Sequence, residues 1–220
     1  MGYFTKLDNV NSVKSFDKLN ENKDVDMDLV FVLDKSGSMW GLEKDTIGGF
    51  NSFIKREQAK NQNTRVTLVL FNDEYKILYT RKPIDEVEEL TSEEYFTEGC
   101  TALLDAVGRT IVSLDGEVSR KVMFVITTDG LENASTEFKK DDVKKLIEDH
   151  PWEFLFIGAD IDSYSEAATL GIERGRSANY TKSSAGVSAL FSSVSSFKDE
   201  YEECEEDERV AGTGWKRLLD

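Results

Sequence analysis

Four short apolar runs, separated by longer amphipathic segments, constrain the fold of this chain more than any other feature. The runs cover residues 29–33, 66–71, 122–126 and 154–157, and only Thr67 interrupts them. Unbroken apolar runs of this length are typical of strands buried on both faces, as in a parallel sheet covered by helices. Between and after the runs, apolar residues recur at helical spacing over 42–54, 103–114, 143–147 and 187–197. The alternation predicts an α/β doubly wound sheet with helices on both faces.

One segment follows the other strand pattern. Tyr75, Ile77 and Tyr79 alternate with polar residues, although Leu78 interrupts the alternation. This pattern predicts a half-exposed edge strand. Because the segment closely follows the run 66–71, a tight turn would make it antiparallel to its neighbour. We therefore expect a mostly parallel sheet with one antiparallel edge strand.

The length of 220 residues fits one domain with short extensions. We expect residues 1–26 to form a polar N-terminal extension, able to include a short helix. Residues 27–200 would form the domain, and the acidic run 199–208 would end its packed part. Residues 201–220 would then be an acidic C-terminal tail, although its Trp215, Leu218 and Leu219 could dock on the domain.

Charge and composition exclude several classes of partner. The formal net charge of −16 would repel nucleic acid and anionic membranes, so we expect neither as a partner. No apolar run approaches the roughly 20 residues of a membrane span. The first residues lack the apolar core of a secretory signal, and the two cysteines make no disulfide framework. We therefore expect a cytoplasmic protein.

Side chains that carry oxygen gather where the predicted strands end. The first strand leads into Asp34-Lys35-Ser36-Gly37-Ser38, in which Gly37 allows a tight turn between the oxygen-bearing side chains. Thr101 begins a predicted helix and Asp129 follows the run 122–126, so both would lie at the same edge of the sheet, where α/β sheets bind ligands. Turn chemistry alone would explain the first loop. The combination instead predicts a site for a hard cation, Mg²⁺ or alternatively Mn²⁺ or Ca²⁺, held by Asp34, Ser36, Ser38, Thr101 and Asp129.

Three motifs in order make the pattern specific. Asp-x-Ser-x-Ser after the first strand, Gly-x-Thr-x-Leu-x-Asp-Ala at 99–106 and Thr-Asp-Gly at 128–130 resemble the metal-ion-dependent adhesion site of von Willebrand factor type A domains. The resemblance covers about residues 27–200 and is greatest to small prokaryotic or phage members. It implies a six-stranded sheet.

The resemblance also implies roles for the matching residues. Ser36, Ser38 and Thr101 would ligate the metal through their hydroxyls, whereas Asp34 and Asp129 would act through water or orient the hydroxyls. A partner's Asp or Glu carboxylate would complete the coordination. Integrin-type members carry further acidic residues soon after the first loop, which this chain lacks, so we expect no second adjacent metal site.

Three functions fit this site. The first is a non-catalytic, metal-dependent module that binds a protein partner through its carboxylate. The second is a structural subunit of a larger assembly, in which the metal only braces loops. The third, a Mg²⁺-dependent phosphotransferase or phosphatase, is disfavoured because that chemistry needs a second acid where this chain has Ser36. We therefore expect no enzymatic activity.

Residues beside the predicted site leave further alternatives. Trp40 and Met39 could form an exposed contact surface or pack against the first helix. Asp73, Glu98 and Glu132 could contribute to the outer shell of the ion, whereas Asp105 is expected to make local hydrogen bonds. We expect Cys100 to be a small, partly buried residue rather than a reactive thiol.

Overall fold

The structure is a computed structural model that describes residues 25–219 except 61, 120 and 206–209, so the short helix predicted within 1–26 falls almost wholly outside the described residues. A six-stranded sheet forms its centre, with the strand order β3-β2-β1-β4-β5-β6. All neighbouring strands are parallel except β2 and β3, which confirms the predicted sheet with one antiparallel edge. The strands are β1 Met27–Asp34, β2 Thr64–Phe71, β3 Tyr75–Pro83, β4 Val122–Thr128, β5 Glu153–Gly158 and β6 Ser177–Asn179.

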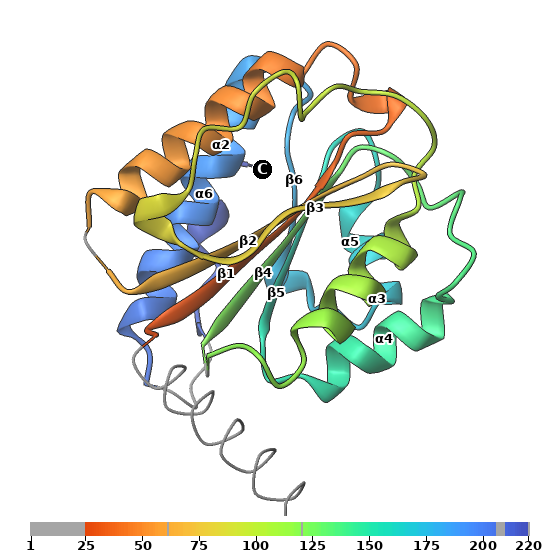
Figure 1. Cartoon of the computed structure of the whole chain (residues 1–220). Helices are drawn as coiled ribbons and strands as arrows, with labels where there is room; N and C mark the ends of the chain where they lie inside the picture. The colour runs from red at the N-terminus through yellow and green to blue at the C-terminus, as the bar shows by residue number, and fades with distance from the viewer. Residues whose placement is uncertain (1–24, 61, 120, 206–209, 220) are drawn as a thin grey trace, which may run out of the picture.

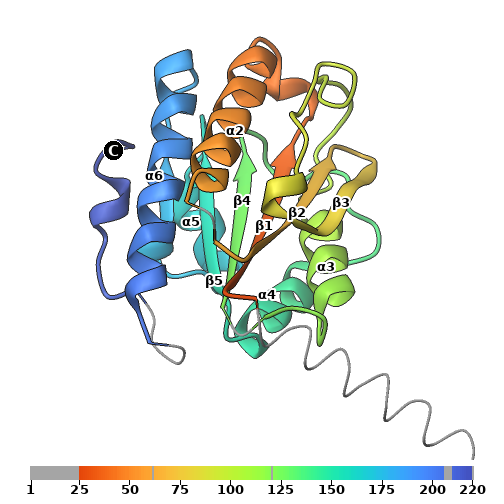
Figure 2. The same ribbon diagram turned by 60° about the vertical axis from the view of Figure 1, so that its left-hand side comes forward.

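Helices cover both faces of the sheet (Figures 1 and 2). One face carries α2 and α6, and the other carries α3, α4 and α5. The α-helices are α2 Glu43–Gln58, α3 Leu103–Leu114, α4 Lys140–Asp149, α5 Ser163–Thr169 and α6 Ser184–Glu203, and short 3₁₀ turns are η1 Gly37–Met39, η2 Ile84–Glu86, η3 Arg174–Arg176 and η4 Gly214–Lys216. None of the helices in the described part of the chain has the length and apolarity to span a membrane.

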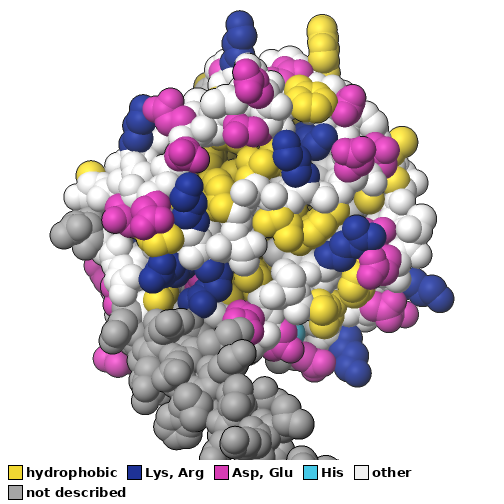
Figure 3. Space-filling model, in the orientation of Figure 1, with side chains coloured by type: hydrophobic (Ala, Val, Ile, Leu, Met, Phe, Trp, Pro, Cys, Tyr) yellow, Lys and Arg dark blue, Asp and Glu magenta, His cyan; other side chains and the backbone are white. Residues whose placement is uncertain are grey.

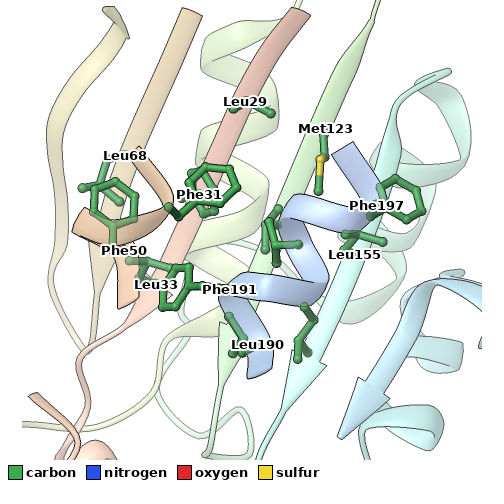
Figure 4. Packing of buried hydrophobic residues seen from close by; sticks show 14 of the residues in the cluster. Leu29, Phe31, Leu33, Phe50, Leu68, Met123, Leu155, Leu190, Phe191 and Phe197 are labelled. Atoms are coloured by element: carbon green, nitrogen blue, oxygen red, sulfur yellow. The ribbon is translucent and has the colours of Figure 1, made fainter. Parts of the chain in front are cut away.

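The central strand β1 explains why the first apolar run is unbroken. Leu29, Phe31 and Leu33 face the helices α2 and α6, as Figure 4 shows, whereas Val30 and Val32 face the opposite core. Successive side chains of a strand point to opposite faces, so a strand buried on both faces needs apolar residues throughout. Each fully buried side chain of this size contributes about 1.5–3 kcal/mol.

The edge strand β3 is irregular at Leu78, where the alternating sequence pattern is interrupted. Tyr79 pairs with Leu68 and Ile77 pairs with Val69, so Leu78 has no partner in the ladder. An extra residue of this kind is a β-bulge, which shifts the alternation of side chains by one position. The bulge explains why Leu78 interrupts the alternating pattern, and it lets Leu78 pack against the core.

The chain after α6 returns to the domain. Val210, Trp215 and Leu219 are buried and join the core on the α6 side, whereas Leu218 is exposed. The Trp215 ring lies 5.6 Å from that of Phe197, edge to face, and its indole N–H donates to a backbone carbonyl on η3. Sequence reasoning placed the end of the packed part at the acidic run 199–208. In the structure Trp215 and Leu219, for which docking was left open, complete the core together with Val210 beyond that run.

Buried carboxylates at the amino ends of the strands are paired with cations. Asp28, at the start of β1, accepts from the guanidinium of Arg81 at 2.8 and 3.3 Å and from the Ser119 backbone N–H at 2.6 Å. Glu153, at the start of β5, binds the guanidinium of Arg176 at 2.6 and 3.2 Å. These carboxylates are therefore neutralised within the fold.

A third buried ion pair joins the two helices on one face of the sheet. The ammonium of Lys198 on α6 lies 2.9 Å from the Glu57 carboxylate on α2, and both side chains are buried. Ser195 donates a hydrogen bond to the same carboxylate at 2.8 Å. Lys198 also binds Gln62 at 2.8 Å and Glu202. This network fixes the position of α6 along α2.

Candidate metal site

The carboxylate of Asp34 lies at the carboxyl end of β1 and is fully buried. It accepts hydrogen bonds from the Ser36 backbone N–H at 2.7 Å and from the Thr128 hydroxyl at 2.6 Å. Among the residues that the structure describes, no lysine or arginine forms an ion pair with it. Burial, to which the charge of Asp129 adds, raises the pKa of Asp34 to about 6. Asp34 is thus a buried acid without a compensating cation.

The two serine hydroxyls extend from Asp34 towards Asp129. The Ser36 and Ser38 hydroxyl oxygens are 3.1 Å apart, and the Ser38 hydroxyl donates to Asp129 Oδ1 at 2.5 Å. Asp129 follows β4 directly and is buried, whereas Ser38 is exposed. These side chains therefore form a continuous row of oxygens from the interior of the molecule to its surface.

Thr101 completes the set of residues predicted from the sequence. A methyl group on Gly130 would lie 2.7 Å from Thr101 Oγ1 and 3.2 Å from Ser38 Oγ, so both hydroxyls border the same small space. The structure thus brings Asp34, Ser36, Ser38, Thr101 and Asp129 to one place at the carboxyl ends of β1 and β4. Glycine at 130 leaves this space open.

Lys182 is a member of the site that sequence reasoning missed. Its ammonium lies 2.7 Å from Asp129 Oδ2, an oxygen that accepts no well-oriented hydrogen bond, and it also donates to the Ser38 carbonyl. Lys182 comes from the loop between β6 and α6, 144 positions from Ser38. No local motif marks it, and only the fold brings this cation to the site.

Hydrogen bonds hold the loops of the site in place. The buried Tyr95 hydroxyl donates to the Asp34 carbonyl at 2.6 Å, and the Gly37 N–H donates to the Gly99 carbonyl at 3.1 Å. The Thr101 N–H donates to the side chain of Asn133 at 2.9 Å, and the backbone N–H of Asn133 donates to the Thr101 carbonyl at 3.0 Å. The oxygen-bearing side chains are therefore positioned by backbone that is itself anchored.

Neighbouring acidic residues brace these loops. Glu132 accepts from the Leu104 N–H at the start of α3, and Asp73 accepts from the Cys100 N–H. Asp105 accepts from the backbone N–H groups of residues 136–138, which agrees with its expected local role. Cys100 is a free cysteine and is exposed rather than partly buried.

Met39 and Trp40, which follow the first loop, differ in their exposure, so one packs inward and the other faces solvent. Met39 is buried, whereas Trp40 is 79% exposed. Met39 therefore packs inward beside α2, and Trp40 is available for contact.

The donors present fit a hard divalent cation. All the side-chain donors are oxygens, and within the described part of the chain a single ammonium, that of Lys182, pairs with the two buried carboxylates. The described residues contain no group of three or more His, Cys, Asp or Glu that could hold a metal, so any ion here relies on hydroxyls. Hydroxyl and carboxylate oxygens suit Mg²⁺ and similar ions rather than soft metals.

Comparison with known proteins gives one family and one fold. The sequence model of the von Willebrand factor type A domain matches residues 28–191, and no curated protein matches the sequence. The vWF domain of the type V pili tip protein Mfa5 from Porphyromonas gingivalis has a TM-score of 0.63 at 12% identity, over 82% of this chain and 97% of that domain. The PilB minor pilin from Streptococcus sanguinis has a TM-score of 0.60 at 14% identity, over 86% of this chain and 64% of the pilin.

A third similar structure carries a metal. Proximal thread matrix protein 1 from the mussel byssus has a TM-score of 0.55 at 19% identity, over 78% of this chain. One structure of that protein has a zinc-occupied MIDAS motif, the metal-ion-dependent adhesion site. The present chain spans 45% of the byssus protein and under two thirds of the pilin. At these identities the similarity concerns the fold alone.

Proposed function

The chain belongs to the von Willebrand factor type A domain family, and we propose that it is a non-catalytic module that binds a protein partner through a divalent cation. The observation that carries this proposal is the buried Asp34 carboxylate, which has no cation of its own beside a second buried acid, Asp129. The hydroxyls of Ser36, Ser38 and Thr101 would ligate the ion, and the two carboxylates would orient the hydroxyls and balance the charge.

The chemistry of these donors suits a carboxylate ligand. Few carboxylates reach the ion, so a divalent cation held here keeps positive charge that an Asp or Glu of the partner can neutralise. The exposed Ser38 marks the side from which the partner would approach. A chain with a net charge of −16 repels acidic partners elsewhere on its surface, so the cation would direct them to this edge.

We propose Mg²⁺ as the ion, with Mn²⁺ and Ca²⁺ as alternatives, because octahedral sites rich in hydroxyls favour it. A non-catalytic role is supported by the named relatives, which are a pilus tip protein, a minor pilin and a matrix protein. It is also supported by the position of His150, the single histidine of the sequence, which precedes β5 at the opposite end of the sheet.

Thermal unfolding with and without metal tests the proposal. We expect Mg²⁺ at 100 times its dissociation constant to stabilise the protein by about 2.7 kcal/mol, and chelator to reverse the effect. Asp34→Asn, which keeps the size of the side chain, should abolish the response, whereas Asp115→Asn at an exposed position should not change it. A full metal response in Asp34→Asn contradicts the proposed site.

The structural alternative, in which the metal only braces loops, differs in its dependence on the serines. We expect Ser36→Ala and Ser38→Ala to abolish partner capture from the native cell, as chelator should. Complexes that survive both substitutions and chelation favour the structural subunit. A screen of phosphate esters with Mg²⁺ tests the remaining enzymatic alternative, for which we expect no turnover.

A further inference from the structure

Large apolar side chains are exposed around the metal site. In the described part of the chain, the exposed large apolar residues are Trp40, Ile77, Phe96, Val112, Leu131 and Leu218. Three of these lie in the loops that build the site. Trp40 follows Ser38 by two positions, Leu131 follows Asp129 by two positions, and Phe96 precedes Thr101 in the loop that leads to α3.

The loops hold these side chains in fixed places. Phe96 lies against the metal loop, because the Lys35 ammonium is 4.8 Å from its ring centre and the Glu98 N–H donates to the Lys35 carbonyl. Glu43 accepts from the Gly41 N–H at 2.8 Å and from the Thr97 hydroxyl at 2.6 Å, which ties the loop of Trp40 to the loop of Phe96. Leu131 lies between Gly130 and Glu132, whose hydrogen bonds fix that loop.

Exposed apolar side chains that gather around one site are candidates for contact with a partner. Trp40 is 79% exposed, Leu131 55% and Phe96 44%. Burial of such a side chain gives about 1.5–3 kcal/mol, and tryptophan is enriched among the residues that dominate binding at interfaces. In Figure 3, apolar side chains stand out between acidic and basic ones at the upper end of the molecule, where the loops after β1 lie in Figure 1.

The charge around the site restricts the partner further. Glu98 is exposed in the loop of Phe96, Asp73 is exposed in the turn between β2 and β3 and accepts from the Cys100 N–H, and the whole chain is strongly acidic. A polyacidic segment would be repelled here, whereas a single carboxylate would be held by the cation. The neighbours of that carboxylate would then meet apolar surface.

From these observations we propose that Trp40, Phe96 and Leu131 form an apolar rim that binds large apolar side chains next to the partner's carboxylate. The inference rests on the proposed function and specifies the partner: a protein segment with one Asp or Glu flanked by aromatic or aliphatic residues and few other acids. The cation selects the carboxylate, and the apolar rim selects its neighbours.

A displayed library of random 12-residue peptides tests the inference. The full chain is the bait in Mg²⁺, and bound peptides are released with chelator. We expect the released peptides to carry one Asp or Glu with a large apolar residue within two positions. Acidic peptides without apolar neighbours overturn the apolar rim and leave the proposed function standing. The absence of acidic peptides from the released pool overturns the proposed function, and the rim with it.

Variants then test the rim directly with one released peptide. We expect Trp40→Ala, Phe96→Ala and Leu131→Ala each to weaken binding about tenfold in the presence of Mg²⁺. Val112→Ala, an exposed apolar position on α3, is the matched control and should change affinity less than twofold. Mg²⁺ affinity measured without peptide should be the same in all four variants. If Trp40→Ala binds the peptide as well as Val112→Ala does, the rim is refuted.

Discussion

The two ends of β1 each carry a buried aspartate, and the fold treats them differently. Asp28 at the amino end is held by the Arg81 guanidinium and a backbone N–H. Asp34 at the carboxyl end accepts hydrogen bonds from Ser36 and Thr128, and among the described residues no lysine or arginine pairs with it. The aspartate at the amino end is therefore stabilised by a counter-ion, whereas the aspartate at the carboxyl end is a site at which a cation can bind.

The neighbouring strands repeat the contrast with different cations. Glu153 at the amino end of β5 is bound by two nitrogens of Arg176, whose planar group fits a carboxylate. Asp129 at the carboxyl end of β4 is paired, among the described cations, with the ammonium of Lys182 alone, a compact charge on a flexible and partly exposed side chain. A lysine can withdraw from such a contact more readily than a bidentate arginine can. The difference marks the amino ends as structural and the carboxyl ends as available to a ligand.

The largest expected effect comes from removing the cation at the amino end. Arg81→Ala leaves Asp28 buried without its counter-ion, which should lower the free energy of unfolding by about 3–5 kcal/mol. Urea unfolding measures the loss, and Lys55→Ala, which breaks an exposed pair with Glu89, is the control with less than about 1 kcal/mol expected. A loss for Arg81→Ala as small as that of the control would break the comparison.

The second effect concerns pH: unlike Arg81→Ala, which lowers the free energy of unfolding, a substitution of Asp34 should raise it at neutral pH. The pKa of Asp34 is raised to about 6 by burial, so in metal-free protein its contribution to stability is complete below the unfolded pKa, near about 4, and is lost as pH rises through 6. The loss approaches about 3 kcal/mol. Urea unfolding in chelator at pH 4.5, 6 and 7.5 should show Asp34→Asn gaining stability over the natural protein as pH rises. If the difference in free energy of unfolding between Asp34→Asn and the natural protein is the same at all three pH values, the raised pKa of Asp34 is wrong.

The third effect tests the space between the hydroxyls. A methyl group in Gly130→Ala would press on the hydroxyls of Thr101 and Ser38, and overpacking of this kind costs about 1–3 kcal/mol. We expect Mg²⁺ affinity, measured by calorimetry, to fall at least about tenfold. Gly48→Ala on α2 meets nothing within 4 Å and serves as the control. Unchanged Mg²⁺ affinity in Gly130→Ala would place the ion elsewhere.

The smallest effect sharpens the contrast between lysine and arginine. Lys182→Met removes a positive charge 2.7 Å from Asp129 but keeps an apolar side chain of similar length. We expect Mg²⁺ affinity to rise by about tenfold or less, because the ammonium and the divalent ion compete for the same carboxylate in a partly exposed place. Lys55→Met controls for net charge. An affinity that falls would mean that Lys182 supports the ion instead of opposing it.

Most of the fold could be predicted because each central strand is buried on both faces, which leaves a plain signature in the sequence. The edge strand was also predictable, but its bulge at Leu78 was visible only as a broken alternation. The short strand β6 was expected only from the family resemblance, since Ser177, Ala178 and Asn179 have no strand pattern. Docking of Trp215 was expected only as a possibility, because a short apolar segment carries no local signal of where it packs.

For the candidate site, sequence reasoning identified the residues whose motifs lie at strand ends, and the structure places them together. It missed the residues that contribute through long-range contacts. Tyr95 donates to the Asp34 carbonyl from another loop, and Lys182 contacts Asp129 from the segment between β6 and α6. Neither belongs to a motif, since a single tyrosine or lysine in a polar segment is compatible with many positions. Thr128 stood within a recognised motif, but its hydrogen bond to Asp34 required the register of β1 and β4.

The buried pair between Glu57 and Lys198 has a mechanical consequence for α6. A shift of this helix by one turn, about 5.4 Å, would leave two buried charges without their partners. The ion pair therefore holds the carboxyl end of α6 against α2. The other end begins at Ser184, two positions after Lys182, which contacts Asp129. The short segment 180–183 between β6 and α6 therefore carries Lys182, next to a helix whose other end is held by a buried ion pair.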